Sequence, residues 1–284
     1  MGVWAVAAIT GLIQGVIEWL PVSSKTMITL VYAAGGYSFG TGYVMGLLAN
    51  FGSFFAALWY FRRDVVDALR ALRHPFSADE DARLLRYVVL ATIATGLVGL
   101  PIYAGVTAAF TLTGGAYAMV AIGVLLLVTS VISLQRERLA QTADVAAAAD
   151  VGERGRAPGT WGSIVVGLCQ GLAALPGISR SAVTVTPLLW MGRPAKTALR
   201  LSFLIDVLAL IAAGAVPLVF GHHGLSDIHQ IGVGPTVLMV VIAAVVSFFT
   251  IDVILSIASR LRSSVITGAI GILTIAAAAV LHLR

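Results

Sequence analysis

The chain is dominated by apolar runs that are long enough to cross a lipid bilayer. A spanning helix needs about 20 predominantly apolar residues. Runs of this kind lie at 41–61, 87–105, 115–134, 200–220, 234–257 and 265–282. The pattern therefore predicts an all-α integral membrane protein with six transmembrane helices.

Two further apolar regions are interrupted in the middle by proline and small polar residues. Region 3–35 is broken by LPVSSK at 20–25, and region 161–192 is broken by LPGISRS at 175–181. Each half is too short to cross, and non-helical backbone at membrane depth persists only where protein buries it or where it lines a wet cavity. We therefore expect two re-entrant helix-loop-helix hairpins.

Both hairpins begin with nearly the same five-residue motif, which indicates an internal repeat. GLIQG at 11–15 matches GLCQG at 167–171, and each is followed by Leu-Pro and then serine. One hairpin plus three spanning helices crosses the membrane an odd number of times, so the second copy is predicted to be inverted. We expect a first repeat at 1–134, a linker at 135–160 and a second repeat at 161–284, with the hairpin tips meeting near the midplane.

The basic residues predict the orientation and the partners. Most of the 18 Lys and Arg residues lie in loops 62–86, 135–160 and 259–264 or beside the second hairpin, so these loops are expected to be cytoplasmic. Hydrophobic residues make up 59% of the chain and charged residues 11%, which excludes an ordinary soluble domain. The net charge of +5 comes from short loops, not from a basic face, so we expect a plasma-membrane protein that binds no nucleic acid.

Polar residues inside the first hairpin are candidates for chemistry. A carboxylate in an apolar helix costs about 2.5–3.5 kcal/mol at mid-membrane and is a functional candidate by default, and Glu18 is such a residue. Gln14 lies one turn earlier, so both polar groups share one helix face. The hydroxyls of Ser23 and Ser24 follow directly.

The second hairpin carries the pattern of an anion site. After a Pro-Gly bend it supplies four polar side chains, Ser179, Arg180, Ser181 and Thr184. A guanidinium fork matches phosphate oxygens, and backbone N–H groups at a helix start favour anions. A buried arginine needs a partner, either Glu18 or an incoming phosphate. The structural alternative is that Glu18 only pairs with Lys25 or Arg180 and so holds the hairpins together.

The polar motifs of the two hairpins resemble those of a known protein family. Residues 14–24 (QGVIEWLPVSS) and 176–184 (PGISRSAVT) resemble the two signature motifs of the undecaprenyl-diphosphate phosphatase family, the bacitracin-resistance type. The segments 50–53 (NFGS) and 201–204 (LSFL) resemble weaker family segments. The resemblance implies an enzyme that removes the terminal phosphate of a polyprenyl diphosphate and regenerates the monophosphate carrier lipid for envelope glycan assembly.

The resemblance also implies roles for single residues. Gln14 and Glu18 match a family pair proposed to bind a divalent cation or to assist proton transfer. Ser23 and Ser24 match paired serines, of which the second is the proposed nucleophile. The implied catalytic residues are Glu18, Ser24 and Arg180, and the implied substrate-binding residues are Gln14, Ser23, Ser179, Ser181 and Thr184.

Two departures from the family pattern bear on the chemistry. Met27 stands where the family commonly has histidine, and Gln14 stands where it has its first carboxylate. Glu18 is then the base expected to activate either Ser24 or a water. With one carboxylate, we expect Mg²⁺ or Ca²⁺ to arrive with the diphosphate, which such ions often bridge while keeping waters.

Two alternatives remain at this stage. Inverted repeats with broken helices are also a common transporter plan, so a flippase or transporter of a polyprenyl phosphate or another anion is the second hypothesis. Asp206 and Asp252 fall in spanning segments, where Arg200 and Arg260 are expected as their counter-charges. The other interpretation of these two carboxylates is a polar vestibule that opens inward.

Overall fold

The computed structural model describes residues 2–112, 115–147, 157–220, 224–257 and 263–282, and all its regular elements are helices. The first hairpin consists of α1 (Val3–Ile17) and α2 (Ser24–Ala34), and the second of α7 (Thr160–Gly171), the short 3₁₀ helix η1 (Leu172–Ala174) and α8 (Arg180–Trp190). The long helices are α3 (Phe39–Tyr60), α5 (Glu80–Leu112), α6 (Gly115–Ala147), α9 (Ala195–Val219), α11 (Val233–Ser256) and α12 (Ser264–His282). Two short helices, α4 (Arg62–Ala71) and α10 (Gly224–Ile231), complete the order.

Five of these helices are long and apolar enough to cross a membrane, namely α3, α5, α6, α9 and α11. In α12 the apolar helix found over Ser264–Ala279 is shorter. Large apolar side chains such as Leu97, Val131 and Phe249 are exposed on the outer helices. A surface of this kind suits lipid better than water. The prediction of an all-helical membrane protein is therefore confirmed.

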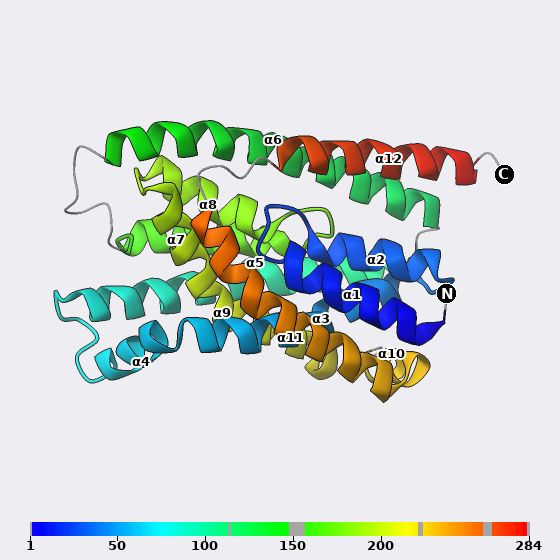
Figure 1. Cartoon of the computed structure of the whole chain (residues 1–284), viewed down its shortest axis with the longest axis horizontal. Helices are drawn as coiled ribbons and strands as arrows, with labels where there is room; N and C mark the ends of the chain where they lie inside the picture. The colour runs from blue at the N-terminus through cyan, green and yellow to red at the C-terminus, as the bar shows by residue number, and fades with distance from the viewer. Residues whose placement is uncertain (1, 113–114, 148–156, 221–223, 258–262, 283–284) are drawn as a thin grey trace.

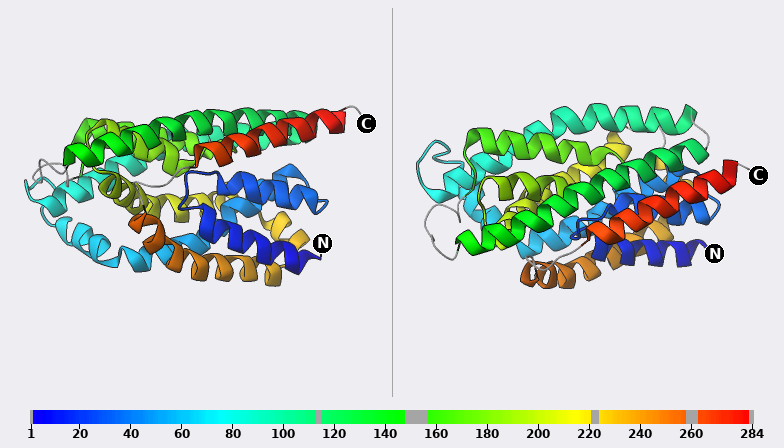
Figure 2. Two further views of the ribbon diagram at one scale, coloured as in Figure 1. Left: turned by 45° about the horizontal axis from the view of Figure 1, so that its top comes forward. Right: turned by 90° about the horizontal axis from the view of Figure 1, so that it is seen from above.

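The long helices run roughly along one axis, and the two hairpins enter the bundle from its opposite ends (Figure 1). The turn between α1 and α2 and the turn before α8 approach each other in the middle of the molecule. Helices α6 and α12 lie side by side along one edge (Figure 2). Helix α3 is mostly buried and packs on α2, α9 and α11. The bundle thus places both hairpin tips at its centre.

Glycine sets how the first helix of each hairpin packs. Helix α1 packs on α11, and α7 packs on α5, so each hairpin contacts a long helix from the other half of the chain. A β-carbon on Gly11 would lie 2.7 Å from the carbonyl oxygen of Met239, and one on Gly167 would lie 2.3 Å from that of Ala91. Small residues spaced four apart allow such close helix contacts. The repeated motif is therefore a packing device.

Several helices extend beyond the apolar runs that predicted them. Helix α5 begins at Glu80, not near 87, and α6 continues to Ala147, well into the predicted linker at 135–160. The apolar run ends near residue 134, but residues with high helix propensity, such as Gln, Arg, Glu, Leu and Ala, continue the helix beyond it. Residues 148–156 of that linker lie outside the described residues.

The extension of α6 has a packing role. The Glu137 carboxylate accepts hydrogen bonds from the backbone N–H groups of Ser263 and Ser264, at 2.6 and 2.9 Å. It also accepts one from the Ser264 hydroxyl at 2.8 Å. These contacts satisfy donor groups at the start of α12, which would otherwise lack partners.

The helix α4 was not predicted, because a search for long apolar runs does not detect a short amphipathic helix. Charged residues such as Arg62, Asp64 and Asp67 alternate in it with apolar ones. Such a helix lies well at a membrane surface. The predicted loop 62–86 is thus partly helical.

Candidate active site

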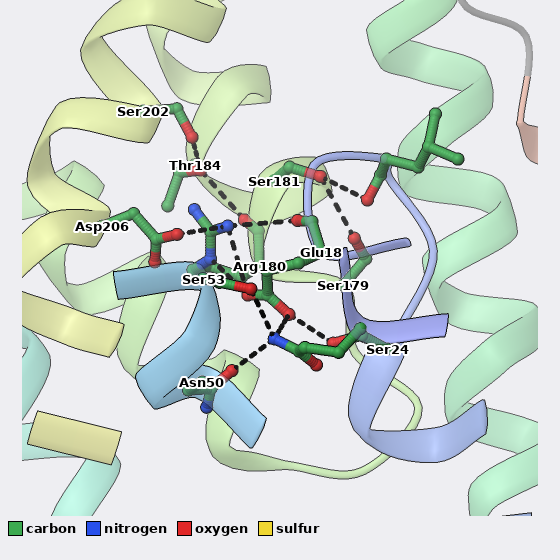
Figure 3. Close-up of polar contacts among 12 residues, drawn as sticks. Glu18, Ser24, Asn50, Ser53, Ser179, Arg180, Ser181, Thr184, Ser202 and Asp206 are labelled. Atoms are coloured by element: carbon green, nitrogen blue, oxygen red, sulfur yellow. Dashed lines mark hydrogen bonds and ion pairs between the residues drawn. The ribbon is translucent and has the colours of Figure 1, made fainter. Parts of the chain in front are cut away.

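The two hairpin tips contact each other through Glu18 and Arg180. The Nε and Nη2 groups of Arg180 each donate to Oε1 of Glu18 at 3.3 Å, and Nη2 also donates to the Glu18 backbone oxygen at 3.2 Å. The Ser181 hydroxyl donates to the backbone oxygen of Leu20 at 2.9 Å (Figure 3). Residues that are far apart in the sequence thus form one buried polar cluster.

The Glu18 carboxylate is also the partner of a hydroxyl in its own hairpin. Ser24, the first residue of α2, donates to Oε2 of Glu18, and the Gln14 amide donates to the same oxygen at 3.0 Å. The same Gln14 nitrogen lies 2.9 Å from Oδ1 of Asn50 and 3.1 Å from the Ser53 hydroxyl, both on α3, so its two hydrogens are shared among three acceptors. A serine is activated by a general base bonded to its hydroxyl, and the Glu18 carboxylate occupies that position for Ser24.

The predicted hydroxyls of the second hairpin lie beside Arg180. The Ser179 and Ser181 hydroxyls are 3.4 Å apart. Thr184 donates to the Arg180 backbone oxygen at 2.9 Å, and its hydroxyl lies 2.5 Å from that of Ser202 on α9 (Figure 3). All four hydroxyls are buried. The structure thus brings the predicted residues of this hairpin together.

The bends of both hairpins are held by local contacts. Gly177 has a φ of +104°, a conformation that side chains with a β-carbon rarely adopt. Thr129 on α6 donates to the Gly177 backbone oxygen at 2.7 Å and accepts from the Ser179 N–H at 3.2 Å. In the first hairpin, Ser23 precedes α2 and accepts a hydrogen bond from Thr26 at 2.9 Å. The Ser23 hydroxyl is therefore bonded to a side chain of its own hairpin.

Asp206 is a second carboxylate at Arg180, which corrects the sequence-based expectation. Its Oδ2 lies 2.5 Å from Nη2 of Arg180. This contact is an ion pair without hydrogen-bond alignment, because neither Asp206 oxygen accepts a hydrogen bond from the described residues. Arg200, the predicted partner, pairs with Asp64 at 2.7 Å. Six residues along an α-helix turn through about 240°, so Arg200 and Asp206 face different sides of α9.

Asp252 lies away from this cluster. Its Oδ1 accepts a hydrogen bond from the Tyr60 hydroxyl at 3.1 Å, at an exposed position. Arg260, its predicted counter-charge, lies outside the described residues. The two aspartates therefore have different environments.

A cavity of about 380 Å³ opens from the polar cluster along α5 and α9. Its polar end is lined by Glu18, Lys25, Asn50, Gln170, Arg180 and Asp206. The rest of its wall is mainly apolar and includes Leu47, Gly96, Leu100, Ala209, Ala213, Val216 and Phe220, together with the hydroxyl-bearing Tyr43, Thr92, Thr95 and Tyr103. The site can therefore hold a ligand with one charged end and one apolar end.

Comparison with known proteins assigns the chain to a family. The family described as "Bacitracin resistance protein BacA" matches residues 7–276. The chain belongs to this family. The expectation drawn from the two sequence motifs is thus confirmed.

Several curated proteins resemble this chain over most of their length. A protein named undecaprenyl-diphosphatase from Saccharolobus solfataricus is 34% identical over 273 residues, which cover 95% of this chain and 94% of the relative. Proteins of the same name from Haloarcula marismortui and Pyrobaculum aerophilum are 38% and 35% identical over 252 and 279 residues. These alignments cover 87% and 95% of this chain and 87% and 96% of the relatives.

Gln14 and Glu18, the residues that the family resemblance assigns to a divalent cation, are bonded to other groups of the protein in this arrangement. Both Glu18 carboxylate oxygens already accept hydrogen bonds, one from Arg180 and the other from Gln14 and Ser24. Gln14 directs its amide nitrogen toward Glu18, and its buried amide oxygen accepts no hydrogen bond from the described residues. Within the described ranges no group of three His, Cys, Asp or Glu side chains is placed to hold a metal ion. The Glu18 carboxylate is thus arranged to bind the Arg180 guanidinium.

Sequence reasoning missed several polar residues that this BacA-family site contains. Asn50, Ser53 and Ser202 lie in segments that were noted for their family likeness but were given no role. Asp206 follows Gly167 by the same interval at which Asn50 follows Gly11. Aligning the repeats beyond their motifs would therefore have placed Asp206 at the site.

Proposed function

We propose that this chain is a membrane phosphatase that removes the terminal phosphate of a polyprenyl diphosphate. One observation carries the proposal: the Ser24 hydroxyl donates to the buried Glu18 carboxylate, and Glu18 and Arg180 line the polar end of a mainly apolar cavity. The curated relatives named undecaprenyl-diphosphatase support the substrate class. The products are the monophosphate lipid and inorganic phosphate.

The chemistry follows from this arrangement. Ser24 attacks the terminal phosphorus while Glu18 accepts the hydroxyl proton, and the bond from that phosphorus to the bridging oxygen breaks. The leaving group is the polyprenyl monophosphate, and water then hydrolyses the phosphoserine to release inorganic phosphate. In the alternative route, Glu18 activates the attacking water directly. Arg180 stabilises charge on the transferred phosphoryl group in both routes.

Arg180 has a donor available for this role. Its Nη1 is buried and has no hydrogen-bond partner among the described residues. Buried donors are nearly always paired in native structures. A phosphate oxygen at the polar end of the cavity would supply the missing acceptor.

The apolar part of the cavity suits a prenyl chain. Its wall follows α9 from Asp206 to Phe220, a rise of about 21 Å at 1.5 Å per residue. Small residues such as Gly96, Ala209 and Ala213 leave the slot open between larger side chains. The diphosphate would lie at Arg180, with Ser179, Ser181, Thr184 and Gln14 around it.

The membrane arrangement is part of the proposal. It comprises six spanning helices, with α12 as the sixth, and two re-entrant hairpins in inverted repeats at 1–134 and 161–284. The matched packing of α1 on α11 and of α7 on α5 supports the repeat. Loops 62–86, 135–160 and 259–264 would be cytoplasmic. Single cysteines in these loops should be labelled only from the cytoplasmic side, and labelling from outside would refute the orientation.

A divalent cation that accompanies the diphosphate stays a prediction of the family resemblance. No step above depends on it. It would lie on the phosphate oxygens, since the Glu18 carboxylate is already occupied.

Phosphate release from a polyprenyl diphosphate by the purified protein tests the proposal. We expect release by the natural chain and its loss in Glu18→Gln, Ser24→Ala and Arg180→Ala. Thermal unfolding of each variant separates lost chemistry from lost folding. No release above the background of the combined triple variant, together with movement of lipid phosphate across liposomes, would favour a carrier instead.

A further inference from the structure

Lys25 is a buried cation that the proposed mechanism does not yet use. It is the second residue of α2, 8% exposed, and it lines the polar end of the cavity. Its ammonium makes no hydrogen bond or ion pair with any residue that the structure describes. The charged groups that act on it electrostatically are Glu18, Asp206 and Arg180. Lys25 thus faces the cavity without a direct partner.

The other cation of the site is in the opposite situation. Arg180 is in contact with two carboxylates, at 3.3 Å from Glu18 and 2.5 Å from Asp206. Two carboxylates and two cations make the cluster formally neutral, but the carboxylates lie on only one of the cations. Apart from Nη1 of Arg180, the cationic group of this cluster without a direct partner among the described residues is therefore the Lys25 ammonium.

The position of Lys25 is costly unless an anion binds there. Burying an ammonium without a partner is strongly unfavourable. A cation in the first turn of a helix also opposes the helix dipole, which favours negative charge at that end. Helix α8 begins at Arg180, so the starts of α2 and α8 meet at the same cluster. Two helix starts and an unpartnered ammonium around one cavity favour a ligand with more than one negative charge.

We infer that Lys25 is a substrate-binding residue whose ammonium holds a phosphate oxygen of the diphosphate. This inference rests on the proposed function. Lys25 supplies, as a fixed side chain, positive charge that a divalent cation would otherwise bring to the diphosphate. Phosphate release by the natural chain should therefore depend only weakly on added divalent cations, and it should depend on them strongly when Lys25 is replaced by a neutral residue.

Chemical labelling tests the contact without relying on activity. The chain has only two lysines, Lys25 and Lys196, and Lys196 is exposed. Reductive methylation of the natural chain, read by mass spectrometry at each lysine, compares the two directly. With inorganic diphosphate at about ten times its Kd, roughly a tenth of the sites stay empty, so methylation of Lys25 should slow about tenfold. Methylation of Lys196 should not change.

Kinetics test the consequence. A hydrogen bond to a charged group contributes about 1.5–3 kcal/mol, so Lys25→Met should raise KM for farnesyl diphosphate about tenfold or more. Both proteins are first freed of divalent cations with a chelator. Addition of Mg²⁺ should then lower the KM of Lys25→Met and leave the KM of the natural chain nearly unchanged. Lys25→Arg should restore most of the affinity, and Lys196→Met serves as the matched control.

The outcomes separate the two proposals. Equal methylation of Lys25 with and without diphosphate, or an unchanged KM in Lys25→Met, would overturn the role of Lys25 while leaving phosphatase activity intact. Protection of Lys25 without phosphate release from the natural chain would instead remove the phosphatase proposal and keep the anion site. If Lys25→Met fails to fold, the methylation of the natural chain still decides.

Discussion

The two hairpins share a backbone frame but carry different side chains at matched positions. Each begins with the same glycine-spaced motif, breaks at Leu-Pro and starts its second helix after a serine. Counted from those motifs, Ala174 stands where the first hairpin has Glu18, and Arg180 stands where it has Ser24. The two hairpins therefore share their backbone frame, while the proposed nucleophile and base lie on one tip and the guanidinium on the other.

This division makes the site depend on contact between the tips. Neither hairpin contains both Glu18 and Arg180, and the cavity reaches its polar end where they meet. The matched helices α3 and α9 differ in the same way, with Asn50 in one and Asp206 in the other. The added carboxylate lies on Arg180, which belongs to the same half of the chain.

The largest effect is expected from removing the cation of the second tip. Arg180→Met would leave Glu18 and Asp206 buried near each other without their shared partner. Breaking a buried ion pair in this way costs about 3–5 kcal/mol. We expect a much lower unfolding temperature by scanning fluorimetry in detergent. The double variant Arg180→Met/Asp206→Asn should recover part of the loss, and no recovery would mean that Asp206 does not depend on Arg180.

A smaller loss of stability is expected from substitutions of the glycines in the repeated motif. In Gly167→Ala the new β-carbon would meet the Ala91 carbonyl oxygen at 2.3 Å, and in Gly11→Ala it would meet the Met239 carbonyl oxygen at 2.7 Å. Overpacking of this kind costs about 1–3 kcal/mol. Both variants should unfold at lower temperature, with Gly167→Ala the more affected.

The control for this pair is Gly105→Ala in α5, where a β-carbon would meet nothing within 4 Å. Its stability should stay the same or rise, because alanine favours helix over glycine by about 1 kcal/mol. If Gly11→Ala and Gly167→Ala behaved like this control, the repeated glycines would not be packing devices.

The comparison also explains what the sequence could reveal. Glu18, Ser24 and Arg180 were predicted because each lies in a short motif at a break in an apolar helix. Asp206 was assigned to the wrong partner, since its contact with Arg180 depends on how α8 packs against α9. The length of α6 was missed because hydropathy reports the membrane interior, whereas helix propensity continues the helix to Ala147.

The smallest difference is expected between the two glutamines of the repeated motif. Gln14 donates to Glu18, Asn50 and Ser53, whereas Gln170 donates to Thr95 at 3.0 Å. A hydrogen bond to a carboxylate contributes about 1.5–3 kcal/mol and one between neutral groups about 1 kcal/mol.

Gln14→Leu should therefore lower phosphate release about tenfold or more, while Gln170→Leu should change it by less than about fivefold, since 1.4 kcal/mol corresponds to a factor of ten. Initial rates with farnesyl diphosphate provide the measurement. Both variants replace an amide by an apolar group of similar size, so packing changes alike in both. Equal losses would mean that the Gln170 side of the cavity also contacts the reacting phosphate, and that the chemistry is shared more evenly between the hairpins than their side chains indicate.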